Sequence, residues 1–562
     1  MHFKLVDNLT MLCLLLFIGL LHAAVAELGG DTFRAAVVEF AQRGSTKASP
    51  ASNLRDTLDA LQSSVVRAKA AGASIVVYSE AILWIWPDIL VYEGKLTPEE
   101  GRKEMRLYGQ ALPPVGTIAK PADASPFGVI SKLAAKHEVI IVFNMVDLQP
   151  CTSCPGGEGQ FNADVVVGAA GQLLATYHKS HLYGSSPLLD EPSRPDPTSF
   201  VAPSLGGGQV RFGMLICYDM QFLTPGAALL AQNITHFVFS TSWVNQPPLY
   251  VATMIQQGWS RRHGTVLIAA NRGAGRDVAG SGIYVAGEAI AQRFDPTTPA
   301  LPLGDVVIVA DVPISYRAGN TALAKVKAPA SSEHTSSRPR PRPHALALPS
   351  QPCTIASTGD VNNGSCVVFD AAATQGAGAG AGGGNVNASA SRAAMATTTT
   401  LTATSLDGVV NCTLTYTLES ASLHANAQGP APFALFAANG AYSFPGTPDA
   451  QVVGTCAVMQ CAPSRVVSSS DGDGALVCAA TYNSSRGLFA NFVLRGVFAK
   501  GSQALPMVAA GEVQLLNRSE IEFDQEVRKV DGRVVASVGV PSFAELHAQR
   551  LYSAVLYAVD GK

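Results

Sequence analysis

Short apolar runs alternate with a clear helical repeat in the first half of the chain. Leu54, Leu58, Leu61, Val65 and Ala68 recur at the spacing of one helix face, and Gly72 follows as a stop signal. Most of the apolar runs are β-branched and lack polar alternation, which is typical of strands buried on both faces. The expected strands cover Ala35–Phe40, Ile75–Tyr78, Val139–Phe143, Val165–Val167, Leu173–Tyr177, Val210–Ile216, Phe237–Ser240, Val266–Ala270 and Val306–Ala310. This series predicts an α/β fold in which helices cover the sheets.

The pattern changes after about residue 330. Residues 331–343 are rich in Ser, Pro and Arg, so we assign 331–350 to an exposed linker between a domain at 27–330 and a second domain at 351–562. We expect disorder at 371–404, because a segment of Gly, Ala and Thr buries too little apolar surface to offset its chain entropy. Val410–Leu418 then alternates apolar and polar positions, and Leu488–Leu494 and Val508–Leu516 also have strand patterns. The second domain is therefore expected to be β-rich.

The N-terminus has the pattern of a secretory signal. Lys4 supplies a positive charge, Met11–Leu21 is an apolar core too short for a convincing membrane span, and Ala24-Val-Ala26 is a small-residue cleavage site. We expect cleavage after Ala26 and exclude residues 1–26 from the fold. The C-terminal residues lack the hydrophobic tail of a glycolipid anchor, so we predict a secreted protein without a stable membrane anchor.

Three polar residues stand where apolar strands end. Cys217 follows the run that closes at Ile216, Glu80 lies just beyond Ile75–Tyr78, and Lys179 follows Leu173–Tyr177. Open α/β sheets place their chemistry at such strand ends. A thiol between a strand and a helix lies near backbone N–H groups, which favour the thiolate and can also receive an oxyanion. The alternative for each residue alone is structural, since cysteine is often buried and lysine is usually solvated.

Together these residues have the order and contexts of a known family. Further matches are Asp31–Phe40, Asp164–Val167, Cys217-Tyr-Asp219, Thr241–Asn245 and Gly280–Tyr284. The chain resembles the nitrilase, or carbon–nitrogen hydrolase, superfamily, and within it the vanin pantetheinase and biotinidase branch. The resemblance implies an α/β fold with a nitrilase-like α-β-β-α sandwich, followed by a smaller β-rich, disulfide-stapled domain similar to the vanin base domain.

The resemblance also implies a role for each of the three residues. Glu80 would be the general base, Lys179 would stabilise the tetrahedral intermediate, and Cys217 would be the nucleophile. The backbone N–H of Tyr218 would help to hold the oxyanion. The family's second glutamate is expected seven positions after the lysine, which without a gap is Ser186.

Several residues near these motifs are candidates for secondary roles. Asp190 and Glu191 are displaced candidates for the second glutamate. Substrate pockets are apolar with a few polar anchors, and the pocket candidates are Trp243, Asn245, Trp259 and Tyr284, with core packing as the alternative for the tryptophans. For Trp84 and Trp86 core packing is the favoured interpretation.

The histidines and the net charge of the chain bear on other classes of site and function. His178 and His181 flank Lys179 and raise the alternative of a papain-like Cys–His pair, but no papain-type context surrounds Cys217, so structural or rim roles are expected. The 11 histidines form no His-Glu-x-x-His pair, and we expect neither a metal nor a cofactor. A formal net charge of −3 gives no electrostatic case for nucleic acid. The expected partner is a small-molecule amide, and the oligomeric state stays open.

The ten cysteines fit an oxidising compartment. With Cys13 in the leader and Cys217 kept for chemistry, the plausible local disulfides are Cys151–Cys154, Cys353–Cys366, Cys412–Cys478 and Cys456–Cys461, although spacing does not fix connectivity. A redox or metal half-site is the alternative for Cys151-Thr-Ser-Cys154. The Asn-x-Ser/Thr acceptors, most of them in the second domain, predict glycosylation at Asn233, Asn363, Asn387, Asn411, Asn483 and Asn517.

The expected function is therefore that of a secreted amidohydrolase. The resemblance implies cleavage of pantetheine to pantothenate and cysteamine through a cysteine thioester. A biotinidase-like enzyme acting on biotinyl amides is the alternative within the same class. A catalytically silent glycoprotein that binds a partner through its β-rich domain is the alternative outside it.

Overall fold

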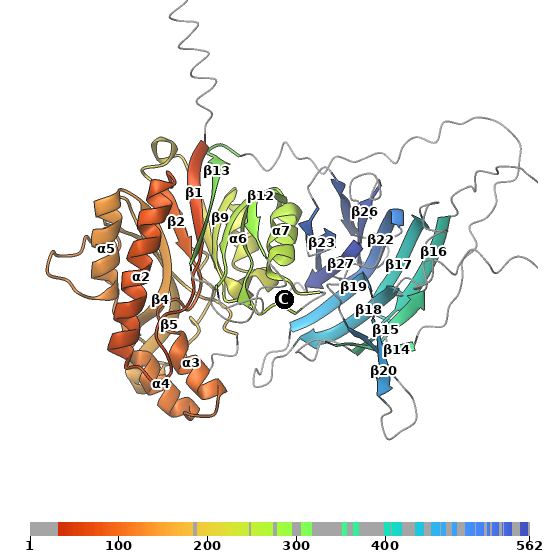
Figure 1. Cartoon of the computed structure of the whole chain (residues 1–562), viewed down its shortest axis with the longest axis horizontal. Coiled ribbons are helices and arrows are strands. Elements are labelled where there is room, and N and C mark those ends of the chain that lie inside the picture. The colour runs from red at the N-terminus through yellow and green to blue at the C-terminus, as the bar shows by residue number, and fades with distance from the viewer. Residues whose placement is uncertain are drawn as a thin grey trace, which may run out of the picture.

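The structure is a computed structural model, shown in Figure 1. It describes residues 32–183, 188–246, 249–273, 278–294, 305–316, 351–356, 363–369, 398–405, 407–418, 433–442, 451–460, 462–467, 475–479, 489–500, 502–510, 514–516, 520–527, 531, 533–541 and 551–559. The expected leader, the linker at 331–350 and Ser186 lie outside these residues, as do the acceptors Asn387, Asn483 and Asn517.

The N-terminal domain alternates strands and helices, as the apolar pattern predicts. Its α-helices are α2 (Pro50–Ala70), α3 (Ile85–Tyr92), α4 (Pro98–Arg106), α5 (Pro126–His137), α6 (Gly226–Ala231) and α7 (Ala252–His263). Its short 3-10 helices are η1 (Pro155–Gly157), η2 (Gly206–Gly208) and η3 (Cys217–Gln221). Its strands are β1 (Thr32–Glu39), β2 (Ile75–Tyr78), β3 (Gly109–Gln110), β4 (Ile140–Pro150), β5 (Glu158–Val167), β6 (Leu173–His178), β7 (Ser199–Val201), β8 (Arg211–Ile216), β9 (His236–Ser240), β10 (Val266–Ala270), β11 (Ser281–Val285), β12 (Glu288–Arg293) and β13 (Val306–Pro313).

These strands form two sheets that pack face to face. The first has the order β13-β1-β2-β4-β5-β6, with β3 on β4, and the second has the order β12-β11-β10-β9-β8-β7. Inward side chains of both sheets, such as Val37, Val77, Met214 and Val238, share one apolar core. Strand β2 is buried along its whole length, because a helix covers its other face. The α-β-β-α sandwich expected from the sequence is therefore confirmed.

Helix α2 shows how the outer layers form. Pro50 occupies its first turn, and the Ser49 side chain accepts a hydrogen bond from the Ser52 amide at its N-terminus (3.3 Å). Leu61 and Val65 are buried against the first sheet, as their spacing predicts. Figure 1 shows α2 and α5 on the outside of this sheet, and α6 and α7 on the far side of the second.

The C-terminal domain is built from strands, as expected. These are β14 (Gln351–Ala356), β15 (Asn363–Phe369), β16 (Thr398–Thr404), β17 (Asn411–Leu418), β18 (Phe433–Tyr442), β19 (Gln451–Gln460), β20 (Ala462–Val467), β21 (Ala475–Ala479), β22 (Phe489–Lys500), β23 (Gln503–Ala510), β24 (Gln514–Leu515), β25 (Glu522–Val527), β26 (Arg533–Val540) and β27 (Leu551–Val559). Within the described residues they form one sheet in the order β20-β21-β14-β15-β18-β19-β27-β23-β24 and another in the order β16-β17-β22-β26-β25.

The disorder expected at 371–404 is wrong for its last part, since 398–404 is strand β16. It pairs with β17 along its whole length and buries Leu401 and Ala403 in the core between the two sheets. The alternation of Thr with Leu and Ala supplies one apolar face, which a purely compositional argument misses. Residues 371–397 lie outside the described part of the chain.

The disulfide pattern is partly corrected. Cys151–Cys154 is confirmed, but Cys412 pairs with Cys456, so the expected pairs Cys412–Cys478 and Cys456–Cys461 are both wrong. Strands β17 and β19 belong to different sheets, and this disulfide joins the two sheets across the core, which local spacing does not reveal. Cys366 is buried and disulfide-bonded.

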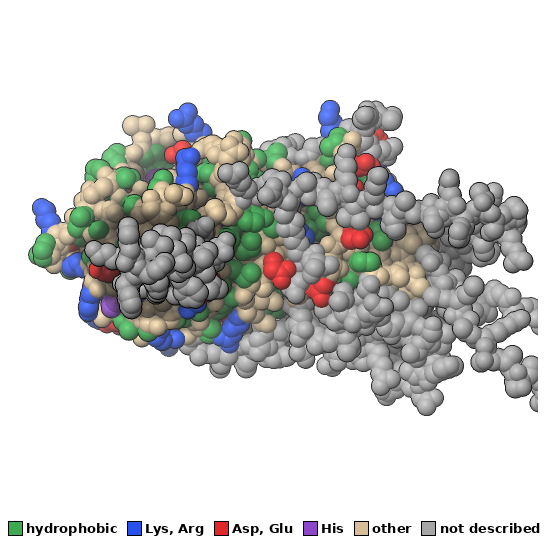
Figure 2. Space-filling view, turned by 90° about the horizontal axis from the view of Figure 1, so that it is seen from above, with side chains coloured by type: hydrophobic (Ala, Val, Ile, Leu, Met, Phe, Trp, Pro, Cys, Tyr) green, Lys and Arg blue, Asp and Glu red, His purple; other side chains and the backbone are tan. Residues whose placement is uncertain are grey.

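The side chains of Cys353, Cys461 and Cys478 lie outside the described residues. In the part of the chain that the structure describes, no helix is long and apolar enough to cross a membrane. On the face shown in Figure 2, the described Lys and Arg side chains stand singly around the N-terminal domain and do not gather into a patch.

The two domains share apolar packing. Helix α7 of the first domain lies against β23 of the second (Figure 1). The core between the two sheets of the first domain continues through Trp259 to Leu505, Met507 and Tyr557 of the second. The domains therefore meet through a buried interface.

Candidate active site

The residues singled out from strand ends meet at one place. Glu80 lies two residues past β2, Lys179 directly follows β6, and Cys217 directly follows β8. All three are buried, with exposures of 4%, 3% and 7%. The Lys179 ammonium donates to Glu80 Oε1 at 2.7 Å. The two facing sheets thus bring a carboxylate, an ammonium and a thiol together in a water-poor environment.

The Glu80 carboxylate is fully engaged. Its Oε1 accepts from Lys179 and from the Asn162 amide (2.8 Å), and its Oε2 accepts from the Ser242 backbone N–H (3.1 Å). The Ser242 backbone amide also lies near the Cys217 thiol and lowers its pKa. One backbone amide therefore holds the carboxylate and favours the thiolate form of Cys217.

A buried asparagine holds the turn that carries Glu80. Asn144 on β4 accepts from the backbone N–H of Ala81 (2.8 Å) and from the Trp84 indole (2.7 Å), and donates to Asn162 (2.7 Å) and Asp164 (2.9 Å). All four hydrogen-bonding positions of its amide are filled. Ala81 has a φ of +60°, a conformation that needs such support.

The thiol lies in a turn with unusual backbone geometry. Cys217 is the first residue of η3 and has a φ of +44°. Asp219 stabilises this turn: its Oδ2 accepts from the Ile216 N–H (3.1 Å) and the Tyr177 hydroxyl (2.8 Å), and its Oδ1 accepts from the His181 N–H (3.0 Å). Asp219 therefore ties the segment of Lys179 to the segment of Cys217.

The charge state of the thiol differs from the expectation. Burial and the negative charge of Glu80 raise the pKa of Cys217 to about 12, while Lys179, Thr241 and Ser242 offset only part of this. The expectation that the turn favours a thiolate is therefore wrong for the resting site, because desolvation outweighs the backbone N–H groups. The proton must leave as the sulfur attacks.

The other ionisable groups of the site are also shifted. Burial lowers the pKa of Lys179, but electrostatic interactions with Glu80, Cys217 and Asp219 raise it by more. The pKa of Lys179 therefore lies above its ordinary value. Burial raises the pKa of Asp164 to about 8 and that of Asp219 to about 7. Lys179 thus stays an ammonium, and Asp164 is mostly protonated at neutral pH.

A second pair of charges lies near Glu80. Burial, and then Glu80, raise the pKa of Asp88 to about 6, while burial lowers the pKa of Arg272 to about 10 against the attraction of Asp88 and Glu80. Arg272 donates to the Ser242 hydroxyl at 3.3 Å. Arg272 therefore reaches the same segment whose amide bonds Glu80.

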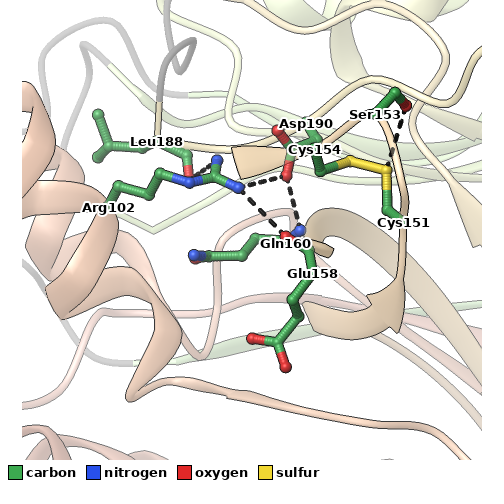
Figure 3. Close-up of a disulfide and its surroundings, with 8 residues drawn as sticks. All are labelled: Arg102, Cys151, Ser153, Cys154, Glu158, Gln160, Leu188 and Asp190. Atoms are coloured by element: carbon green, nitrogen blue, oxygen red, sulfur yellow. Dashed lines mark hydrogen bonds and ion pairs between the residues drawn. A yellow bond between two sulfur atoms is a disulfide. The ribbon is translucent and has the colours of Figure 1, made fainter. Parts of the chain in front are cut away.

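The displaced candidates for the second glutamate are engaged elsewhere. Asp190 forms an ion pair with Arg102 of α4 at 2.7 Å and accepts from the Gln160 N–H at 2.8 Å. Figure 3 shows this ion pair and the Cys151–Cys154 disulfide at the end of the β4–β5 hairpin.

Glu191 accepts from the Leu182 N–H at 2.6 Å. In the described part of the chain neither Asp190 nor Glu191 bonds Glu80, whose side-chain partners are Lys179 and the Asn162 amide.

The two histidines do not form a papain-like pair. His178 pairs with Asp147 (2.8 Å) and stacks on Phe161, and His181 bonds the Thr224 carbonyl oxygen (2.8 Å). Both rings are thus held by other partners, as expected for structural or rim residues.

The pocket candidates take structural positions. The Trp243 indole donates to the Tyr250 carbonyl oxygen (3.2 Å), and Asn245 holds the first residue of α7 by accepting from the Ala252 N–H (2.8 Å). The Tyr284 hydroxyl donates to Gln256 of α7 (3.0 Å).

Trp259 and Tyr218 are also buried, whereas Trp86 is partly exposed. Trp259 packs edge-on against Phe237, and the Trp86 indole donates to the Arg43 carbonyl oxygen (2.9 Å). Tyr218 is buried directly after Cys217, with its ring against Phe222. Trp259 belongs to the core and also lines a small cavity with Met220 and Leu505, while the oxyanion role of the Tyr218 N–H stays a prediction.

Sequence reasoning gave no role to Asn144, Asn162 or Asp219. A usable signal was present for Asn144, which interrupts the apolar run Ile140–Val146 of β4, whereas Asn162 is one of several polar residues in the first half of β5. A buried amide requires hydrogen-bond partners, so such a position marks a polar network inside the fold.

Two family models match the chain. The carbon-nitrogen hydrolase model matches residues 34–267, and the vanin C-terminal domain model matches residues 387–557. The first match contains Glu80, Lys179 and Cys217 and covers most of the sandwich. The second covers most of the β-rich domain.

The curated relatives are named as biotinidases and as pantetheine hydrolases or pantetheinases. The chain is 30% identical to the biotinidase of Takifugu rubripes over 273 residues, which is 47% of this chain and 51% of that one. It is 30% identical to pantetheine hydrolase VNN2 of Homo sapiens over 259 residues (44% and 46%), and 28% identical to the pantetheinase of Canis lupus familiaris over 307 residues (51% and 56%). The chain thus spans about half the length of the curated relatives it matches.

Solved structures give more distant matches. An amidase from Nesterenkonia sp. AN1 matches with a TM-score of 0.35 at 17% identity, over 50% of this chain and 92% of that one. Nit3 of Saccharomyces cerevisiae, a member of the nitrilase superfamily, matches with a TM-score of 0.37 at 16% identity, over 54% and 97%.

Proposed function

We propose that this chain, which belongs to the vanin and biotinidase branch of the nitrilase (carbon–nitrogen hydrolase) superfamily, hydrolyses a linear carboxamide through a cysteine thioester. The observation that carries the proposal is the buried Lys179–Glu80 ion pair (2.7 Å) beside the thiol of Cys217. A buried ion pair is costly unless its geometry is good, so its position against a strained thiol turn supports a catalytic role.

In the proposed first step the thiol attacks the amide. Glu80 takes the proton of Cys217 while the sulfur attacks the carbonyl carbon, since the raised pKa of the thiol makes a free thiolate rare. Lys179 and the backbone N–H of Tyr218 stabilise the oxyanion. Glu80 then gives its proton to the departing nitrogen, the C–N bond breaks, and an acyl thioester and a free amine are formed.

In the proposed second step water releases the acid. Glu80 takes a proton from a water molecule that attacks the thioester carbonyl, and the tetrahedral intermediate is again held by Lys179. When it collapses, the proton returns to the sulfur of Cys217 and the carboxylic acid leaves. The hydrogen bonds from Asn162 and Ser242 keep the Glu80 carboxylate in the same orientation through both steps.

The proposed substrate is pantetheine, which is cleaved to pantothenate and cysteamine. Support comes from the relatives named pantetheine hydrolase and pantetheinase, together with the match to the vanin C-terminal domain. A biotinyl amide is the second candidate, because the 30% identity to a biotinidase equals the identity to the pantetheine hydrolase.

We further propose that the protein acts outside the cell after removal of residues 1–26. The Cys151–Cys154 and Cys412–Cys456 disulfides support an oxidising compartment. The acceptor Asn233 is exposed, in a turn with a φ of +59°, and is thus accessible to a glycan. Asn411 is half-buried beside a disulfide cysteine and is a poorer acceptor.

The test is hydrolysis of two fluorogenic amides, one pantothenoyl and one biotinyl, by the wild type and by Cys217→Ala. We expect turnover of the pantothenoyl amide that is lost in the variant. Preferential turnover of the biotinyl amide would replace the proposed substrate. Equal rates for wild type and variant, or no turnover of either amide between pH 4 and 8, would refute the proposed activities.

A further inference from the structure

A hydrogen bond from the second domain reaches the turn that carries the nucleophile. The Tyr557 hydroxyl of β27 donates to Gln221 Oε1 at 2.8 Å. Gln221 is the last residue of η3, whose first residue is Cys217. Tyr557 is 0% exposed and Gln221 is 3% exposed, so the bond is shielded from water. The bond therefore contributes to the position of the turn.

The same tyrosine also contacts a second segment of the site. Its ring packs edge-on against Tyr250, with ring centroids 5.0 Å apart. The carbonyl oxygen of Tyr250 accepts from the indole of Trp243, which directly follows Ser242. Since the Ser242 amide bonds Glu80, Tyr557 is connected through Tyr250 and Trp243 to the segment that holds the general base, as well as to the turn of the thiol.

The geometry of the turn explains why such support is needed. A cysteine with a φ of +44° is in a sparsely populated conformation, which persists only where the surroundings fix it. Asp219 fixes the start of η3 through the Ile216 N–H and the segment after Lys179 through the His181 N–H. The end of η3 is held by Tyr557, across the interface between the domains.

We infer that Tyr557 is a positioning residue for Cys217, through which the β-rich domain takes part in catalysis by the first domain. The expected effect of Tyr557 on kcat rests on the proposed function. In this arrangement the β-rich domain holds the strained thiol turn in its reactive geometry. Loss of the Tyr557 hydroxyl then relaxes the turn while the packing of the ring stays.

The experiment compares Tyr557→Phe with Gln257→Met in the full chain. Gln257 of α7 donates to the Leu516 carbonyl oxygen at 2.8 Å, so each variant loses a buried hydrogen bond between the domains, and Gln257→Met also loses a 3.4 Å bond from Arg261 within α7. The Leu516 oxygen keeps Arg261 as a donor at 3.1 Å. Both variants thus lose a buried side-chain donor at the domain interface, and they differ in whether its bond reaches η3.

For Tyr557→Phe we expect kcat to fall about threefold to tenfold with KM within about twofold, the size of effect that one hydrogen bond has. The buried thiol becomes more accessible when the turn relaxes, so alkylation of Cys217 by iodoacetamide speeds up by a similar factor. Gln257→Met leaves both rates within about twofold. Gln221→Met reproduces the effect of Tyr557→Phe, and the double variant adds nothing to either single one.

Two results would overturn the inference. One is a Tyr557→Phe variant whose kcat and alkylation rate both stay within about twofold of the wild type. The other is a Gln257→Met variant that changes both rates as Tyr557→Phe does, because the effect would then be one of domain stability. A wild type that hydrolyses neither amide would instead refute the proposed function, and the alkylation rates would still test the role of Tyr557.

Discussion

The reactivity of Cys217 should rise when its proposed general base is removed. The raised pKa of the thiol has burial as its first cause and the charge of Glu80 as its second, while Lys179 lowers it. Glu80→Gln removes the negative charge and leaves the Lys179 ammonium unopposed. The pKa of Cys217 in this variant should therefore fall, although amide hydrolysis is lost with the base.

The size of the fall in the pKa of Cys217 follows from the interaction between its charge and that of Glu80. Two unit charges about 4 Å apart interact by about 4 kcal/mol at an effective dielectric constant of about 20. At about 1.4 kcal/mol per pH unit, this limits the fall in the pKa of Cys217 to about three pH units, and we expect one to three. A less basic thiolate is also a weaker nucleophile, so alkylation at pH 8 should be about threefold to fortyfold faster than in the wild type.

The assay is the rate of carbamidomethylation of Cys217 by iodoacetamide, followed by mass spectrometry of its peptide between pH 7 and 9. Cys217→Ala gives the blank, and thermal unfolding of each variant shows that the fold is kept. Lys179→Met should change the rate in the opposite direction, because it removes the cation that favours the thiolate. A Glu80→Gln rate equal to or below that of the wild type would refute this account of the site's electrostatics.

Three further changes test the surrounding structure. Asp219→Asn should lower kcat at least about tenfold, since an amide cannot accept the three hydrogen bonds that the carboxylate accepts. A loss below about threefold would contradict the role of Asp219 in the turn. Asp164 has a pKa raised from 3.8 to about 8 by burial, so its contribution to stability is full below pH 4 and is lost as the pH rises through 8. Asp164→Asn should therefore lessen the fall in urea-unfolding free energy between pH 5 and 8, whereas an unchanged slope would argue against the shift. Replacing Cys412 and Cys456 together by Ser should cost about 4 kcal/mol for a separation of 44 residues, and a loss under about 1 kcal/mol in the same assay would contradict a stapling role.

The strands were predictable where the apolar pattern was long and unbroken. Ile75–Tyr78 and Val266–Ala270 agree with β2 and β10 at both ends, because β-branched residues buried on both faces leave little choice of element. The meeting of Glu80, Lys179 and Cys217 was predictable only from the three together, since each alone could be structural and their shared order matches the family that the chain resembles.

Features that depend on distant contacts were not predictable. The Cys412–Cys456 disulfide joins strands of different sheets, so the pairing follows from the packing of the sheets and not from spacing along the chain. The protonated state of Cys217 results from burial by segments that come from both sheets. The hydrogen bond from Tyr557 spans 336 residues of sequence, and no local pattern indicates it.

The most direct test of the central claim is the mass of the Cys217 peptide during turnover. The wild type is mixed with the pantothenoyl amide, quenched in acid within the first turnovers, and digested. The account predicts an adduct of one pantothenoyl group on Cys217 that hydroxylamine removes. Turnover with no adduct, or with an adduct on another residue, would contradict Cys217 as the nucleophile.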